Sequence, residues 1–105
     1  MDAVRIIVHI RVKNKFNQNK MKKIYRQAAI DYLIGFVENA KKNSGCISID
    51  LLQNEKDGDE FSLVELWESK SAFDEHISST YFQKISQFLA EYADSMEIHR
   101  MQRIH

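Results

Sequence analysis

The first twelve residues alternate between apolar and mixed positions. Every second residue from 4 to 12 is aliphatic, and the positions between them are held by Arg5, Ile7, His9 and Arg11. Successive side chains of a β-strand point to opposite sides, so this period of two predicts a strand with one apolar face. The second face is mixed rather than fully polar, and we expect it to meet an environment drier than bulk solvent.

A period near 3.6 replaces the alternation between residues 21 and 40. The apolar residues at this spacing are Met21, Ile24, Tyr25, Ala28, Tyr32, Leu33, Phe36, Val37 and Ala40. They predict one long amphipathic helix. Gly45 follows, and a glycine after a helix commonly adopts the left-handed conformation that ends it.

Two aliphatic stretches separated by a polar turn predict a β-hairpin. Residues 46–53 and 61–68 supply the strands. Between them, Asp57-Gly58 suits the positive φ of a tight turn. The return strand has two faces, one with Phe61, Leu63, Glu65 and Trp67 and the other with Ser62, Val64, Leu66 and Glu68.

The C-terminal third predicts two helices and a last strand. Ser69 or Ser71 can cap a short helix over residues 72–77, and Thr80 with Gln83 forms a capping box for the next helix. That helix has apolar residues at Tyr81, Phe82, Ile85, Phe88, Leu89 and Tyr92. Residues 96–104 complete the pattern as a strand.

The predicted element order defines a fold class. Strand, helix, strand, strand, helix, strand is the ferredoxin-like βαββαβ arrangement, an α+β fold with a four-stranded antiparallel sheet and the helices on one face. We expect a single domain over residues 1–105. Helices on one face leave the other sheet face uncovered, and we assign to it His9, Arg11, Phe61, Leu63, Glu65 and Trp67. Such an exposed apolar patch predicts a homodimer with the sheets packed face to face, about 10 Å apart.

Charge and composition narrow the classes of partner. The chain has 15 basic and 15 acidic residues, so no net field favours nucleic acid, whose binding depends on Lys and Arg contacts to phosphates. No apolar run approaches the roughly 20 residues that cross a bilayer, so we expect no membrane span. Cys46 is the single cysteine, and with no secretory leader pattern the chain suits the reducing cytoplasm.

Three short stretches carry a family resemblance. They are Asn43-Ser44-Gly45-Cys46, the strand from Phe61 with Glu65-Leu66-Trp67-Glu68-Ser69, and Ala72-Phe73-Asp74-Glu75-His76 followed by Ser79-Thr80-Tyr81-Phe82. Together they resemble the antibiotic biosynthesis monooxygenase family, in its small quinol-monooxygenase-like branch. The resemblance covers nearly the whole chain.

The resemblance implies a dimeric α/β barrel with a pocket between the sheet and helices of each subunit. It also implies a monooxygenase that oxidises a small electron-rich aromatic substrate, phenol-like or quinol-like, with O₂ and without flavin, haem or metal. The haem-degrading branch has a haem-ligating His a few residues after the Phe that matches Phe82. Residues 83–88 contain no His, which disfavours haem degradation.

Cofactor-free oxygenation needs a base, an apolar pocket and a group that stabilises negative charge. His76 or His9 can take the proton, Glu65 can orient a histidine or act as the base, and Trp67 can pack on an aromatic ring. Arg11 can stabilise an anion. We therefore expect catalytic roles for His76, Glu65 and Trp67, and substrate contacts from His9, Arg11, Phe61, Leu63 and Phe82.

Other interpretations of the same residues stay open. His76 can be a structural histidine, Trp67 can belong only to the core and interface, and His9 and Arg11 can form interface ion pairs. The alternatives to an oxygenase are a noncatalytic dimeric domain that binds small ligands or is associated with stress, and an isomerase of a small phosphorylated carbonyl compound, with Arg11 or Arg100 as the anion site. The spacing of the histidines predicts no metal site, and with three glycines no phosphate-cradling loop or nucleotide cofactor is expected.

Overall fold

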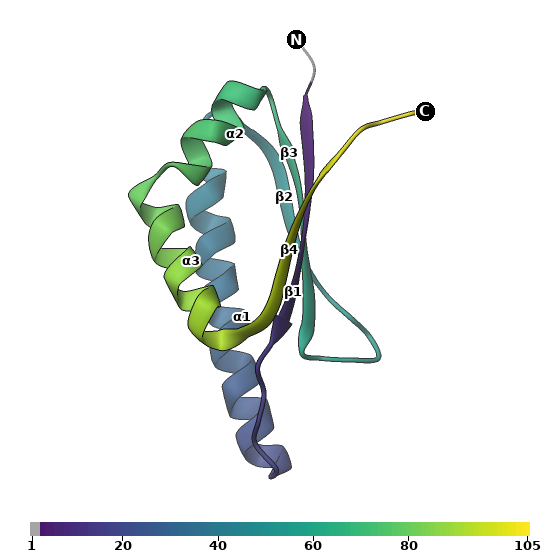
Figure 1. Ribbon diagram of the computed structural model, residues 1–105, viewed down its shortest axis with the longest axis vertical. Helices are drawn as coiled ribbons and strands as arrows, with labels where there is room; N and C mark the ends of the chain where they lie inside the picture. Colours follow the sequence, from purple (N-terminus) through teal and green to yellow (C-terminus); the bar gives the residue numbers. More distant parts are fainter. Residues whose placement is uncertain (1–2) are drawn as a thin grey trace.

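A computed structural model describes residues 3–105 and confirms the predicted element order (Figure 1). The elements are β1 (Val4–Val12), α1 (Asn19–Lys41), β2 (Cys46–Gln53), β3 (Glu60–Trp67), α2 (Lys70–Ile77), α3 (Thr80–Tyr92) and β4 (Ala93–Met101). The strands pair antiparallel in the order β2-β3-β1-β4. The fold is therefore the ferredoxin-like α+β fold.

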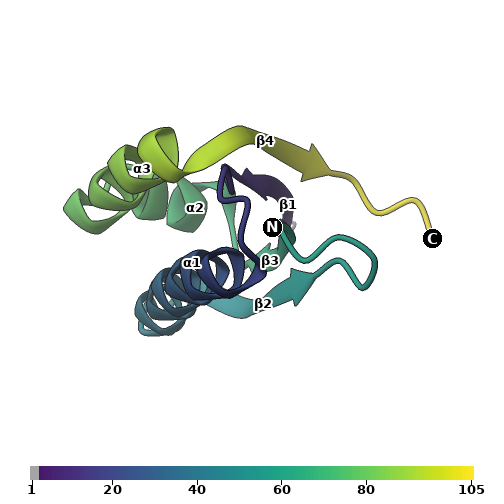
Figure 2. The ribbon, with the colours of Figure 1, turned by 90° about the horizontal axis from the view of Figure 1, so that it is seen from below.

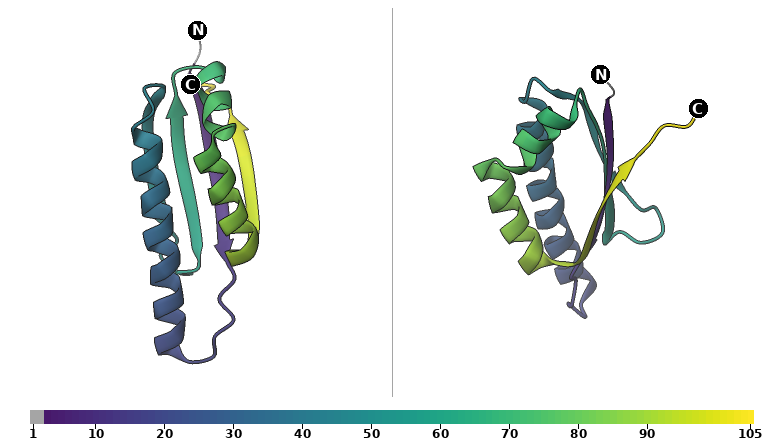
Figure 3. Two further views of the ribbon diagram at one scale, coloured as in Figure 1. Left: turned by 90° about the vertical axis from the view of Figure 1, so that its left-hand side faces the viewer. Right: turned by 45° about the horizontal axis from the view of Figure 1, so that its top comes forward.

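All three helices cover one face of the sheet. The two long helices, α1 and α3, lie side by side over this face, with α2 at one end (Figure 3). Seen from below, β2 and β4 form the two edges of the sheet, with α1 on the side of β2 and α3 on the side of β4 (Figure 2). The opposite sheet face, which we call the outer face, is covered by none of the helices that residues 3–105 form.

The aliphatic face of β1 forms the centre of the core, as its alternation predicts. Its five aliphatic side chains are all buried, and they pack with Leu33 and Phe36 of α1 and with Ile85 and Leu89 of α3. The residues between them, Arg5, Ile7, His9 and Arg11, lie on the outer face. Burying apolar area of this kind is the dominant favourable contribution to folding.

The predicted orientation of β3 is wrong. Phe61, Leu63, Glu65 and Trp67 are buried against the helices, whereas the outer face is formed by the alternate residues, among them Val64. The pairing register explains this, because partners across antiparallel strands share a face, and β1 pairs Val8 with Leu63 and Val4 with Trp67. The face with the larger apolar side chains packs in the core even though it includes a carboxyl group.

Serine side chains start the two later helices. Ser69 is the N-cap of α2 and accepts a hydrogen bond from the backbone N–H of Ala72, as expected for one of the two candidates. Ser79 is the N-cap of α3 and accepts from the N–H of Phe82. The expected Thr80–Gln83 capping box is therefore wrong by one residue, because Thr80 is already the first residue of the helix.

The glycines do not serve as left-handed turn residues. None of the three glycines in the described chain has a positive φ, so the expected left-handed Gly45 and Gly58 are wrong. A Cβ on Gly45 would lie 2.4 Å from the Cβ of Ala72, and one on Gly58 would lie 2.6 Å from a guanidinium nitrogen of Arg26. Gly45 therefore needs glycine because α2 approaches its backbone, whereas at Gly58 the neighbour is the movable end of the Arg26 side chain.

Ion pairs hold the β2–β3 loop against the rest of the fold. Arg26 of α1 binds Asp59 at 2.9 Å, and Asn14 donates to the same carboxylate at 3.1 Å. On the outer face, Arg11 contacts Asp57 and Glu60, each at 2.7 Å. The loop is therefore anchored from both sides of the sheet. None of the helices in residues 3–105 is long and apolar enough to cross a membrane.

Candidate functional site

A carboxyl, an indole and an imidazole lie together beneath the helices. β3 places Glu65 and Trp67 two residues apart on its buried face, and the indole Nε1–H donates a 2.9 Å hydrogen bond to Oε1 of Glu65. α2 follows β3 directly and places His76 over the same indole, with ring centroids 4.5 Å apart and planes tilted by 28°. The strand-to-helix corner thus brings the three predicted catalytic residues into one cluster.

His76 is enclosed by aromatic rings. Besides Trp67, its ring lies 5.5 Å from that of Phe36 and 5.3 Å from that of Phe82. The residue is 3% exposed, and its Nε2 has no hydrogen-bond partner among residues 3–105. Burial lowers the pKa of His76 to about 4, because a protonated imidazole would lose its hydration. The side chain is therefore neutral near pH 7.

Glu65 is buried without a cationic partner in the described part of the chain. The residue is 4% exposed, and its cross-strand neighbours are Ile6 on β1 and Ile49 on β2. Burial raises the pKa of the Glu65 carboxyl, and the hydrogen bond from Trp67 opposes that rise. A carboxylate in such surroundings is a stronger base than one in water.

Glu65 faces a narrow cavity between the sheet and α3. The cavity has a volume of about 20 Å³, and apart from Glu65 and Ser86 every side chain that lines it is apolar. Phe36 of α1 and Phe82 of α3 contribute aromatic walls, with ring centroids 6.3 Å apart. Trp67 and His76 do not line the cavity. They pack behind its wall, where they contact the lining residues Glu65, Phe36 and Phe82.

The cavity is closed on one side by the edge strand β4. Met96 and Ile98 line it, yet they remain 40% and 47% exposed. Their cross-strand partners on β1 are Ile10 and Val8, so both residues lie on the helix-facing side of the sheet. This wall consists of flexible, half-exposed apolar side chains, and the cavity is most easily widened here.

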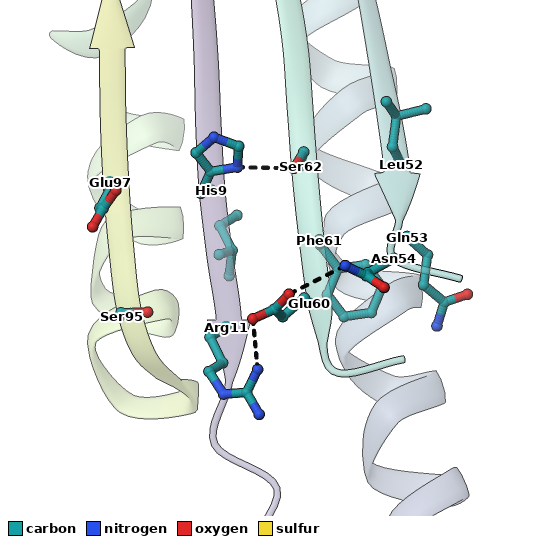
Figure 4. Close-up of a pocket in the computed structure, with 11 residues that line it drawn as sticks. His9, Arg11, Leu52, Gln53, Asn54, Glu60, Phe61, Ser62, Ser95 and Glu97 are labelled. Atoms are coloured by element: carbon teal, nitrogen blue, oxygen red, sulfur yellow. Dashed lines mark hydrogen bonds and ion pairs between the residues drawn. The ribbon is translucent and has the colours of Figure 1, made fainter. Parts of the chain in front are cut away.

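His9 and Arg11 are separated from this cavity by the sheet. They lie on the outer face, where they line an open groove of about 450 Å³ (Figure 4). His9 bonds to the Ser62 hydroxyl at 3.0 Å, and Arg11 is occupied by Asp57 and Glu60. The sequence-based expectation that both share a face with Glu65 and Trp67 is therefore wrong, for the reason given by the β1–β3 register.

The other expected substrate contacts lie on the helix-facing side. Leu63 and Phe82 line the inner cavity with Glu65, whereas Phe61 is buried in the core outside its lining. Sequence reasoning did not identify Phe36, Ser86, Met96 or Ile98 as part of this site. The helical spacing places Phe36 and Ser86 on the core-facing sides of their helices, so the sequence could have indicated them. The positions of Met96 and Ile98 depend on the strand register, which the sequence does not show.

No candidate metal centre was found in the described part of the chain. Among residues 3–105, no group of three or more His, Cys, Asp and Glu side chains is placed to hold a metal ion. His99 and Glu97 do contact each other at 3.0 Å on the outer face, near His9. They form a polar contact within β4 and lie on the opposite side of the sheet from Glu65.

The fold is a small ferredoxin-like domain that matches single subunits of dimeric α/β barrel structures, with a cavity between sheet and helices. The family model for antibiotic biosynthesis monooxygenase matches residues 5–87. The chain belongs to this family, which includes cofactor-independent oxygenases and whose members are typically dimeric.

Solved structures share the fold at low sequence identity. PA3566 from Pseudomonas aeruginosa has a TM-score of 0.83 at 19% identity, with 100% of this chain and 97% of that chain covered. Rv0793 from Mycobacterium tuberculosis has a TM-score of 0.81 at 20% identity, with 99% and 97% covered. SnoaB, a cofactor-independent oxygenase from Streptomyces nogalater, has a TM-score of 0.82 at 11% identity, with 100% and 96% covered.

One curated relative matches part of the chain. An uncharacterized Synechocystis protein, sll1783, is 31% identical over 49 residues. The match covers 47% of this chain and 33% of that protein, so the chain matches about a third of the relative's length.

Proposed function

We propose that this protein is a cofactor-independent monooxygenase that oxidises a small electron-rich aromatic substrate, phenol-like or quinol-like, with O₂. The observation that carries the proposal is the buried Glu65 carboxyl, which faces an apolar cavity, is oriented by the Trp67 N–H and has a raised pKa. A base in an apolar, aromatic-walled site is what deprotonation of a phenol requires.

In the proposed reaction, Glu65 takes the proton of the substrate hydroxyl. The resulting anion is electron-rich enough to react with O₂ at a ring carbon. One oxygen atom stays on that carbon and the other leaves as water, so a phenol becomes a quinone and a quinol becomes a hydroxyquinone. The substrate supplies all of the electrons, and the protein supplies the base and excludes water.

Trp67 and His76 have separate supporting roles in this proposal. The Trp67 N–H holds Oε1 of Glu65, which leaves the second carboxyl oxygen for the substrate. Neutral His76 stacks on the indole and keeps it in place. Nε2 of His76 is buried and has no hydrogen-bond partner among residues 3–105. Such an unpaired atom costs free energy, and a water that enters during turnover can hydrogen-bond to it.

The proposal is tested by O₂ uptake with a panel of naphthols and quinols. We expect wild-type protein to consume O₂ faster than the spontaneous rate with at least one of them. Glu65→Gln keeps the shape of the side chain but removes the base, and we expect it to lower kcat/KM by roughly 10²–10⁴-fold. Glu38→Gln, an exposed acid on α1 that pairs with Lys41, is the matched control and should leave the rate unchanged.

Two results would contradict the proposal. One is a panel in which no member is oxidised faster than in buffer. The other is a Glu65→Gln variant with wild-type turnover. Saturable binding of the same compounds with no O₂ consumption would instead favour the noncatalytic ligand-binding alternative.

The isomerase alternative receives less support from the site. A phosphorylated substrate needs a cation, but none lines the inner cavity, within the residues that the structure describes. Arg11 is bound to two carboxylates on the outer face, and Arg100 lies outside the lining of the inner cavity.

A further inference from the structure

The inner cavity has a second polar group besides Glu65. Ser86 lies on α3, one turn after Phe82, and is the single polar residue that any helix contributes to the cavity lining. Its hydroxyl has no hydrogen-bond partner among residues 3–105, in contrast to Ser79 at the start of the same helix, which both donates and accepts. The hydroxyl is therefore available to a ligand.

Glu65 and Ser86 lie on opposite walls of the cavity. Glu65 comes from the sheet and Ser86 from the helical layer, and apolar side chains fill the lining between them. A molecule bound between the layers meets one polar contact on each side and apolar surface elsewhere. An unpaired polar group in such a site disfavours binding, whereas a paired one favours it.

We propose that Ser86 is a specificity-determining residue that hydrogen-bonds the second oxygen of a dioxygenated aromatic ligand, whose first oxygen pairs with Glu65. The inference rests on the proposed oxygenase function for the role of Glu65. It assigns the cavity a preference for quinols over phenols with one hydroxyl. Phe36 and Phe82 pack on the ring, and Met96 and Ile98 move outward to admit it.

A ligand of this size enters the cavity only if side chains of its wall move. A cavity of about 20 Å³ holds little more than one water, so an aromatic ring must displace side chains to enter. Met96 has an unbranched, flexible side chain, and it is half-exposed on an edge strand with a neighbour on only one side. Glu65 is buried and Ser86 is half-buried, and they lie on a central strand and on a helix rather than on the edge strand. Their positions can therefore select the ligand after Met96 and Ile98 have moved.

The test compares two ligands that differ in one hydroxyl. Binding of 1,4-dihydroxynaphthalene and of 1-naphthol is measured without O₂, so that neither is oxidised, using the fluorescence of Trp67, the single tryptophan of the chain. For Ser86→Ala we expect the dissociation constant of the diol to rise about 3- to 10-fold, the loss of one neutral hydrogen bond. The constant for 1-naphthol should change less than about 2-fold. Ser86→Thr, which keeps the hydroxyl, should restore diol binding.

Gln87→Ala is the matched control, because Gln87 is the exposed neighbour of Ser86 on α3. The proposal is overturned if Ser86→Ala weakens both ligands equally, if it weakens neither, or if the wild-type protein binds neither at millimolar concentration. O₂ uptake is measured separately in air. If the protein binds the diol selectively but does not turn it over, the assignment of Ser86 holds and the oxygenase function is contradicted. If the protein consumes O₂ but binds both ligands equally, the oxygenase function holds and the assignment of Ser86 is contradicted.

Discussion

At the scale of single residues, the site depends on how burial changes two titratable groups in opposite ways. Glu65 and His76 are both nearly inaccessible, and both contact Trp67. Loss of hydration disfavours a charge of either sign, so the pKa of the acid rises and the pKa of the imidazole falls. Among residues 3–105 neither side chain has an ion-pair partner. A charge on either one is therefore costly, which keeps His76 neutral and makes the Glu65 carboxylate a stronger base than an exposed one.

The lowered pKa of His76 makes the stability of the fold depend on pH. An imidazole in the unfolded chain binds a proton near pH 6.5, whereas folded His76 does so only near pH 4. Above pH 6.5 both states hold the neutral ring. As the pH falls from 6.5 towards 4, the unfolded state binds more protons, so the free energy of unfolding decreases by about 3 kcal/mol in total.

We predict that His76→Phe removes this dependence while keeping a ring against Trp67. Between pH 7 and pH 4.5, the free energy of unfolding of the variant relative to wild type should rise by about 2 kcal/mol. Urea denaturation followed by Trp67 fluorescence measures it. His105→Gln, at the exposed C-terminus, is the control and should follow wild type. If the free energies of unfolding of His76→Phe and wild type change with pH in parallel, His76 does not have a lowered pKa in the folded protein.

At the scale of elements, β3 shows how far the sequence alone leads. Local patterns in the sequence predicted the element order, the inward face of β1 and the closeness of Glu65, Trp67 and His76. The spacing of apolar residues and the separation of residues along the chain are both local properties. Which face of β3 turns inward depends on its pairing with β1 and β2, which is set by contacts distant in sequence. Assigning Glu65 and Trp67 to the uncovered face reversed the strand, and as a result His9 and Arg11 were expected on the same side of the sheet as the site.

The corner between β2, β3 and α2 depends on close packing at Gly45. A Cβ at this position would meet the Cβ of Ala72 at 2.4 Å, so α2 must shift to accept one. We predict that Gly45→Ala destabilises the fold by roughly 1–3 kcal/mol, the cost of overpacking a filled site. Because α2 also positions His76, the fluorescence of Trp67 should change in the folded variant.

Gly35→Ala is the matched control for this substitution. Gly35 lies within α1, and the nearest atom to its added Cβ is 3.8 Å away. Alanine there should stabilise the protein by about 0.5–1 kcal/mol, because glycine is a poor helix former. Urea unfolding of the two variants measures both effects, and equal effects from the two would argue against a contact between Gly45 and Ala72.

At the scale of the whole molecule, no layer formed by the described residues covers the outer face. The apolar residues that the register places there include Ile7 of β1, Val64 and Leu66 of β3, and Leu52 of β2. Val64 and Leu52 are 39% and 51% exposed. The original reason for expecting a dimer, exposure of Phe61, Leu63 and Trp67, is wrong, but a different apolar set occupies the same face. Sheet-to-sheet packing with a second copy would bury it.

Val64 offers the sharpest test of a homodimer, because it lies near the middle of the outer face, between Ile7 and Asp50 in neighbouring strands. We expect the wild-type protein at micromolar concentration to have twice the mass of one chain by light scattering. Val64→Lys places a charge where the two sheets would meet, without touching the core, and should yield the mass of one chain. Ile24→Lys adds the same charge to an exposed apolar position of α1 on the opposite side of the molecule and should remain dimeric. A wild-type protein with the mass of one chain would exclude the dimer. A dimer that tolerates Val64→Lys as well as Ile24→Lys would place the contact between subunits elsewhere.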